Sequence, residues 1–315
     1  MSDFRCLRCG HTAAARVLDG VPDARFGVPG AWDIVRCGAC GLDHTAPRPT
    51  GPQLGALYAQ YYNFGGSDEG AYSRLRRRFL TSGLYRLFLA IDGDIAFEAA
   101  KPPAPDRTRL LDVGCNEGRK LLLYRRNGFA AEGLEVNAVA AAAARRLGFT
   151  VHEGDIADLV DPQGFDVLVM SQVIEHVLDL DAALGHCRRL LRPGGALWLS
   201  CPNARSWFRA LFGRRWINWH VPFHITHLRG RDLSAVLERN GFVVETVRTE
   251  TPALWVAQSV IAALFARPPR PTRAFRNPLL VIGLMGLARG LLFPLPMLAN
   301  ALGRGDCLVL RARRG

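Results

Sequence analysis

The sequence predicts an α/β protein whose main domain is a mostly parallel sheet covered by helices on both faces. The main observation is that strand-like and helix-like segments alternate from residue 109 onward. A segment with two pairs of cysteines precedes them, and a segment rich in arginine and apolar residues follows. The chain has 315 residues, of which 49% are hydrophobic and 22% charged, so it can bury a core and is neither disordered nor collagen-like.

The first 48 residues contain two C-x-x-C-G motifs, formed by Cys6 with Cys9 and Cys37 with Cys40. This spacing turns two sulfurs toward one ion, and the following glycine lets backbone N–H groups approach the thiolates. The motifs predict a zinc ribbon, and four thiolates make the Zn²⁺ structural rather than catalytic. Reduced structural thiols and a redox pair are the alternatives. His11 and His44 lie nearby and are expected to be surface histidines rather than partners of the thiolates.

A proline-rich junction leads into two expected helices, 53–62 and 73–91, and prolines near residue 103 mark a linker. The pattern then predicts strands at 110–113, 130–136, 165–170 and 196–200, with helices at 119–127, 138–147 and 182–191. A helix at 231–240 and a strand at 242–249 follow.

Three of the expected strands end in residues suited to an adenosine-containing ligand. The run Leu110-Leu-Asp-Val-Gly-Cys-Asn-Glu-Gly118 follows a strand and opens a helix, where glycines let a ligand approach the backbone. Glu135 ends the next strand, where a carboxylate can accept both ribose hydroxyls. Asp155 ends a third strand, where it can meet an adenine amino group.

These motifs resemble the class I S-adenosylmethionine-dependent methyltransferases, in particular the small-molecule enzymes associated with polysaccharide, lipid and quinone biosynthesis. The matching stretches are LLDVGCNEG, GLEVN, EGDIAD, FDVLVMSQVIEHVLDL, LLRPGGALWLSCPN and WINWHVPFHITHLRGRDLSAVLERNGF. The N-terminal cysteine module is similar to one that precedes some sugar and polysaccharide methyltransferases. The resemblance implies a Rossmann-like, doubly wound sheet of seven mostly parallel strands.

The resemblance also implies the cofactor-binding residues. It places Asp112, Gly114 and Gly118 around the methionine part, Glu135 on the ribose, and Asp155 with Ile156 at the adenine, and it counts Asn116 and Gln172 in the same site. Asn116 stands where the family usually has glycine, and asparagine tolerates a left-handed backbone better than most residues. An NAD-binding domain is the alternative, but the G-x-G-x-x-G spacing is absent.

Methyl transfer to a hydroxyl is helped by a general base, and histidine is the natural candidate. We expect His224, in a segment that resembles the family's acceptor loop, to be a base or an acceptor ligand, with His176 next. The alternative for each is a hydrogen bond to the backbone around the pocket. Trp216, Trp219 and Phe223 are expected mainly to pack this loop.

The C-terminal third carries the whole charge excess, with 17 basic and 5 acidic residues in 203–315 against 23 and 23 before it. Apolar stretches flank four arginines in 267–276, which suits an interfacial segment on an anionic membrane or a lid over a lipid-linked acceptor. Packing on the chain's own domain or a second subunit is the alternative. Neither apolar stretch reaches the roughly 20 residues of a spanning helix.

The expected organisation is therefore a zinc ribbon at 1–48, a helical linker or cap at 49–106, a methyltransferase domain at 107–250, a basic apolar helical insertion at 251–305, and a last strand at 306–315. We expect S-adenosylmethionine-dependent O-methylation of a small-molecule or lipid- or glycan-linked acceptor. The start MSDFRCLRCG has no apolar segment, so we expect a cytoplasmic protein, peripheral at the inner face of the membrane. An RNA methyltransferase and a non-catalytic zinc-ribbon adaptor are the alternatives, and nucleic acid is the less favoured partner.

Overall fold

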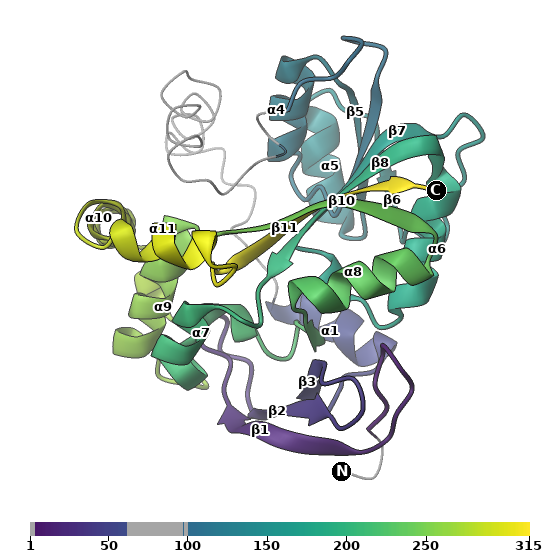
Figure 1. Cartoon of the computed structure of the whole chain (residues 1–315). Coiled ribbons are helices and arrows are strands. Elements are labelled where there is room, and N and C mark those ends of the chain that lie inside the picture. Colours follow the sequence, from purple (N-terminus) through teal and green to yellow (C-terminus); the bar gives the residue numbers. More distant parts are fainter. Residues whose placement is uncertain (1–3, 62–96, 98–99) are drawn as a thin grey trace.

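The computed structural model describes residues 4–61, 97 and 100–315, and these form two sheets with helices around them. The expected helix at 73–91 lies outside the described residues. The large sheet has seven strands in the order β10-β11-β8-β7-β4-β5-β6, and the small N-terminal sheet has the order β1-β2-β3-β9. Figure 1 shows the small sheet at one end of the molecule, below the large one.

Five strands of the large sheet are parallel and two close it antiparallel. The parallel strands are β4 (Arg109–Val113), β5 (Ala130–Glu135), β6 (Val151–Glu153), β7 (Phe165–Ser171) and β8 (Leu191–Pro202). The last strand, β11 (Cys307–Arg314), runs antiparallel to β8 and to β10 (Phe242–Glu250). This is the doubly wound, Rossmann-like sheet that the sequence predicts.

Alternate residues of the same strands enter two separate cores, which explains helices on both faces. Leu111 and Leu168 pack in one core with α6 (Leu180–Leu190) and α8 (Gly230–Arg239). Their neighbours Leu110 and Val167 pack in the other core with α4 (Arg119–Asn127) and α5 (Ala138–Arg146). Figure 1 shows α6 and α8 on the side of the sheet opposite α4 and α5.

Several element boundaries differ from the sequence prediction, and two of these differences have identifiable reasons. The helix expected at 182–191 begins at Leu180 because Asp179 caps it, accepting a hydrogen bond of 2.9 Å from the Ala182 amide. The strand expected at 196–200 begins already at Leu191. Its register with β7 shifts between Phe165 and Val167, so the extra residues form an irregularity within the strand.

The small sheet holds the N-terminal segment against the main domain. Its first three strands are β1 (Ala14–Val21), β2 (Trp32–Cys37) and β3 (Asp43–Ala46). The fourth, β9 (Thr226–His227), comes from the loop that carries His224 and pairs antiparallel with β3. The helix α1 (Gly51–Tyr61) follows the small sheet.

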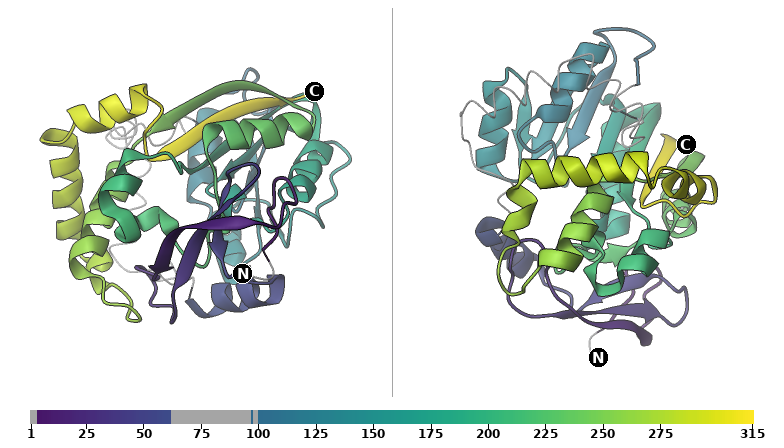
Figure 2. Two further views of the ribbon diagram at one scale, coloured as in Figure 1. Left: turned by 60° about the horizontal axis from the view of Figure 1, so that its bottom comes forward. Right: turned by 90° about the vertical axis from the view of Figure 1, so that its left-hand side faces the viewer.

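Helices fill the connection between β10 and β11. They are α9 (Ala253–Phe265), α10 (Pro278–Gly290) and α11 (Pro294–Ala301), and Figure 2 shows them together on one side of the molecule. Buried side chains of α9, including Val256, pack with Ile34 of the small sheet and Trp219 of the loop before β9. No single helix of the described part of the chain is long and apolar enough to cross a membrane, but the segments Leu279–Gly290 and Pro294–Ala301, bent by 68°, pass that test together by length and composition.

Candidate functional site

The loop between β4 and α4 is built around three left-handed residues, Gly114 (φ 72°), Asn116 (φ 51°) and Gly118 (φ 75°). A Cβ atom on Gly114 would lie 2.9 Å from a methyl group of Val173, and one on Gly118 would lie 2.8 Å from the Cβ of Ala144. The two glycines are therefore required by close packing as well as by backbone conformation. Asn116 adopts the left-handed conformation in their midst, and its side chain accepts a hydrogen bond of 2.7 Å from the Glu117 amide.

Glu135, at the end of β5, fixes this loop from the neighbouring strand. One carboxylate oxygen accepts a hydrogen bond of 2.8 Å from the Asn116 amide, and the other accepts one of 2.9 Å from the Asn137 amide. Glu135 itself is buried, whereas Asn116 and Asn137 are exposed. The carboxylate thus lies at the rim of the loop, and each of its oxygens keeps lone pairs beyond these two hydrogen bonds.

The other expected cofactor residues lie along the same edge. Asp112 is buried at the end of β4. Ile156 is buried after β6, and Asp155 is exposed beside it, its carboxylate accepting a hydrogen bond of 2.9 Å from the Ala157 amide. Gln172 follows β7 with φ 60°. Because β7, β4, β5 and β6 are adjacent and parallel, their carboxyl ends bring these residues to one edge.

The sequence does not predict a network of polar side chains that lies at this edge. Lys120 Nζ donates to Ser171 Oγ at 2.7 Å, Ser171 Oγ lies 2.9 Å from Ser200 Oγ, and Gln172 Nε2 donates to Ser200 Oγ at 3.1 Å. The only signal for it was that Lys120 is one of two lysines in the chain, the other being Lys101.

His176 and His224 come together beside this edge, with Glu175 between them. Glu175 and His176 belong to the 3₁₀ turn Ile174–His176 that follows β7. A ring nitrogen of each histidine and a carboxylate oxygen of Glu175 all lie within 4.8 Å of one another. The ring centroids of His176 and His224 are 4.6 Å apart. The hydroxyl oxygen of Tyr58, on α1, lies 2.7 Å from His176 Nδ1.

Burial makes the histidines of this cluster neutral. It lowers the pKa of His176 to about 4 and that of His224 well below its usual value, with neighbouring histidines adding to the effect at His224. His224 Nδ1 lies 2.8 Å from the Asn218 carbonyl oxygen, which only accepts hydrogen bonds, so the proton is assigned to Nδ1 and a lone pair to Nε2. Burial also raises the pKa of Glu175 to about 8.

The aromatic residues of the loop before β9 are packing residues. Trp216, Trp219 and Phe223 are each at most 2% exposed. The Trp216 indole donates a hydrogen bond of 2.8 Å to Asp306 just before β11, and the Trp219 indole donates one to the Gly213 carbonyl oxygen. Burial raises the pKa of Asp306 to about 6.

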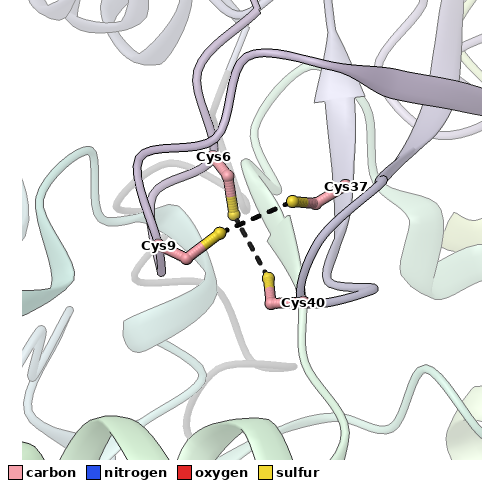
Figure 3. Close-up of side chains that lie close together, drawn as sticks. All are labelled: Cys6, Cys9, Cys37 and Cys40. Carbon is pink, nitrogen blue, oxygen red and sulfur yellow. Dashed lines mark hydrogen bonds between the residues drawn. The ribbon is translucent and has the colours of Figure 1, made fainter.

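The four cysteines of the N-terminal segment converge, as Figure 3 shows. The Cys6 and Cys40 sulfurs are 3.5 Å apart, those of Cys9 and Cys37 are 3.6 Å apart, and all four lie within 4.8 Å of one another. Four thiolates bound to one Zn²⁺ at about 2.3 Å would have sulfurs about 3.8 Å apart, so the cluster fits this ion. Each motif closes in the same way, the Gly10 and Gly41 amides donating to the Cys6 and Cys37 carbonyl oxygens.

One expectation about this module is wrong. His44 is fully buried rather than on the surface, with Nε2 3.4 Å from the Cys6 sulfur and its ring edge-on to Phe4. His11 is exposed, as expected.

Strand β3 joins the cysteine module to the loop that carries His224. The buried Thr45 hydroxyl donates a hydrogen bond of 2.6 Å to the His224 carbonyl oxygen and lies 3.0 Å from His227 Nε2. The Ile225 amide donates to the Glu175 carbonyl oxygen at 2.8 Å. Backbone and side-chain contacts from both directions therefore fix the position of His224.

Comparison with known proteins agrees with this geometry. The model of a family described as a methyltransferase domain matches residues 72–247, which is more than half of the chain. The chain belongs to the methyltransferase domain family. The fold and this membership confirm the expected resemblance to the class I S-adenosylmethionine-dependent methyltransferases.

Individual relatives match only in part. A probable S-adenosylmethionine-dependent methyltransferase of Mycolicibacterium smegmatis is 34% identical over 43% of this chain and 52% of its own. A ubiquinone biosynthesis O-methyltransferase of Paramagnetospirillum magneticum is 32% identical over 43% of this chain and 59% of its own. The chain spans about half the length of the curated relatives it matches. The crystal structure of the [4+2]-cyclase SpnF, 18% identical, has a TM-score of 0.50 over 85% of this chain and 98% of that one, a likeness of fold alone.

The protein has a cavity of about 600 Å³ where the N-terminal module meets the segment after β8. Six arginines line it: Arg36, Arg205, Arg209, Arg229, Arg231 and Arg304. Two buried carboxylates offset part of this charge, Asp43 pairing with Arg36 and Arg209, and Asp232 pairing with Arg229. Because β8 ends and β11 begins at the carboxyl edge of the sheet, the cavity-lining residues that follow β8 come from the same edge as the glycine loop.

Proposed function

We propose that the chain transfers a methyl group from S-adenosylmethionine to an oxygen of a small-molecule or lipid- or glycan-linked acceptor. The observation that carries the proposal is the position of Glu135, a buried carboxylate at the rim of a glycine loop in a chain of this family. Gly114, Asn116 and Gly118 would leave the backbone open to the methionine part, Glu135 would hold the ribose, and Asp155 with Ile156 would meet the adenine. Asp112 and Gln172 would border the same site.

The cofactor supplies a sulfonium methyl that is already a strong electrophile, so the protein has to place the acceptor and exclude water. His224 and His176 are proposed to meet the acceptor as base or ligand, because both are neutral and lie beside the cofactor edge. Oxygen is preferred as the methylated atom because partial relatives are named ubiquinone biosynthesis O-methyltransferases. The four cysteines are proposed to hold a structural Zn²⁺ that supports the small sheet.

A phosphate-bearing lipid acceptor at the inner face of the membrane accords with the surface beside the site. The arginine-lined cavity favours an anionic group. The segment from α10 to α11 exposes apolar side chains, among them Leu279 (82%), Ile282 (66%) and Leu291 (77%). Four exposed arginines, Arg267, Arg270, Arg273 and Arg276, precede this segment in the chain, and Arg289 lies within α10. Apolar side chains rimmed by cations suit the surface of an anionic bilayer.

Two measurements test the proposal. Calorimetry with S-adenosylmethionine is expected to show binding, and absence of binding heat would favour a non-catalytic adaptor. Lysate lipid, glycan and RNA fractions incubated with methyl-labelled cofactor are expected to take up label in the lipid or glycan fraction. Label in RNA alone would replace the acceptor proposed here.

Membrane contact is tested by flotation with vesicles of anionic and of neutral lipid. The wild type is expected to float with anionic vesicles, and the double variant Leu279→Asp/Leu291→Asp to stay behind. Val160→Asp is the control because Val160 is 78% exposed in the loop before β7, far along the chain from the insertion. Equal flotation of the double variant and the control would remove α10 and α11 from the contact.

A further inference from the structure

Glu175 is a buried carboxylate without a hydrogen-bond partner. Its side chain is 1% exposed, and neither oxygen has a partner among the described residues. His224 Nε2 lies 3.8 Å from Oε1, on a ring that burial keeps neutral. Burying a carboxyl group without a hydrogen-bond partner destabilises a fold, so such a group calls for an explanation, of which a bound ion is one.

The surroundings of Glu175 supply the missing partners of one kind of ligand. We propose that Glu175, His176 and His224 bind a divalent first-row transition metal ion, at a site separate from the four cysteines. Two ligand atoms bound to a common ion at about 2.1 Å lie roughly 3.0–4.2 Å apart. The 3.8 Å between Glu175 and His224 falls in this range, and the group as a whole needs only a small contraction from 4.8 Å. Two imidazoles and one carboxylate suit zinc, manganese or iron rather than calcium.

The ligands are oriented by hydrogen bonds outside the site. His224 is held by the bond from Nδ1 to the Asn218 carbonyl oxygen, which leaves Nε2 for the ion. The backbone of Glu175 is tied to Ile225 and that of His224 to Thr45, so both ligand-bearing segments are braced against each other. Metal-binding histidines in proteins characteristically have such a partner on the second ring nitrogen.

One contact competes with the ion. His220 Nδ1 lies 3.3 Å from His224 Nε2 and donates to it in the tautomer assigned above. Binding must displace this hydrogen bond, so the site is expected to bind more weakly than the four-cysteine cluster. An acceptor hydroxyl at such an ion would lose its proton more readily, which deepens the function proposed above and rests on it.

The test titrates the zinc-loaded protein with Co²⁺, and elemental analysis after dialysis counts zinc and cobalt separately. The wild type is expected to take up one Co²⁺ per chain in addition to the ribbon zinc. Glu175→Gln and His224→Gln are each expected to weaken Co²⁺ binding at least tenfold. Glu175→Gln keeps the shape and neutrality of a protonated carboxyl, so it is expected to fold. His186→Gln and Glu238→Gln change the same residue types on α6 and α8 and serve as controls.

Two results would overturn the inference: a wild type that takes up no metal beyond the ribbon zinc, or folded Glu175→Gln protein that binds Co²⁺ as tightly as the wild type. Affinity for S-adenosylmethionine is measured on the same samples. A wild type that binds S-adenosylmethionine but takes up no metal beyond the ribbon zinc refutes only this inference. Absence of cofactor binding with the metal site intact refutes the proposed function instead.

Discussion

Replacing Glu135 by alanine separates its two roles, tying the glycine loop and holding the ribose. The variant loses two hydrogen bonds from backbone amides to a carboxylate, and such bonds contribute about 1.5–3 kcal/mol each. Because Asn116 and Asn137 are exposed, water replaces part of this loss. We therefore expect the free energy of unfolding to fall by about 1–3 kcal/mol.

Cofactor affinity is expected to fall at least tenfold in Glu135→Ala, or about 1.4 kcal/mol. Calorimetry with S-adenosylmethionine measures it. Glu135→Gln is expected to lie between the wild type and Glu135→Ala, because it keeps one acceptor oxygen but turns an NH₂ group toward the other amide. Glu153→Ala is the control, since Glu153 ends the neighbouring strand β6 and its ion pair with Arg145, at 3.1 Å, is exposed.

An analogue of S-adenosylhomocysteine without ribose hydroxyls distinguishes a direct contact from a collapsed loop. The wild type is expected to bind this analogue more weakly than the parent, and Glu135→Ala to bind both alike. If Glu135→Ala keeps wild-type affinity for S-adenosylmethionine, or still prefers the intact ribose, Glu135 only ties the loop and the assignment is wrong.

Three other variants test the remaining contacts. Cys37→Ser should remove the one zinc per chain that metal analysis is expected to find, and a folded, metal-free wild type would contradict the ribbon. Thr45→Val should lower the free energy of unfolding by about 1–3 kcal/mol in urea, because the His224 carbonyl oxygen and the His227 ring lose a buried partner, whereas exposed Thr150→Val should not. Asp306→Asn tests a raised pKa. Burial raises the pKa of Asp306 to about 6 in the folded protein from an ordinary 3.8, so the free energy of unfolding of the wild type should fall by about 2 kcal/mol between pH 4 and pH 7 relative to the variant. Parallel curves for the two proteins would show that burial does not raise this pKa.

The sequence predicted the elements of the large sheet because their signals are local. Apolar runs of strand length alternate with helical segments, and the helix at Arg119–Asn127 begins and ends where it was expected. The cysteine cluster was predictable for the same reason, because spacing within each motif fixes where two sulfurs point. The left-handed residue at Asn116 also follows from its place between two glycines of a tight loop.

The features that the sequence did not predict, such as the burial of His44, depend on contacts between segments that are far apart in the chain. His44 is buried because Phe4 and the cysteine cluster fold over it, and nothing near it in the chain indicates this. Glu175 is next to His176 in the sequence, but this does not predict a site, because adjacent Glu and His residues are common on helices. His224 lies 49 residues further along the chain, and only the folded structure brings it close to Glu175. The fold also buries the Glu175 carboxylate without a hydrogen-bond partner among the described residues.

Strand β3 connects the cysteine module, the arginine-lined cavity and the loop that carries His224. Its residues follow the second cysteine pair, Asp43 pairs with two arginines of the cavity, and Thr45 holds the His224 loop. The cofactor edge is built instead from the ends of β4, β5 and β6, which belong to the opposite end of the sheet from β10 and β11. Zinc loss in Cys37→Ser should therefore impair acceptor binding and methyl transfer before it changes affinity for S-adenosylmethionine. A parallel loss of both would mean that the small sheet supports the whole domain rather than its acceptor side.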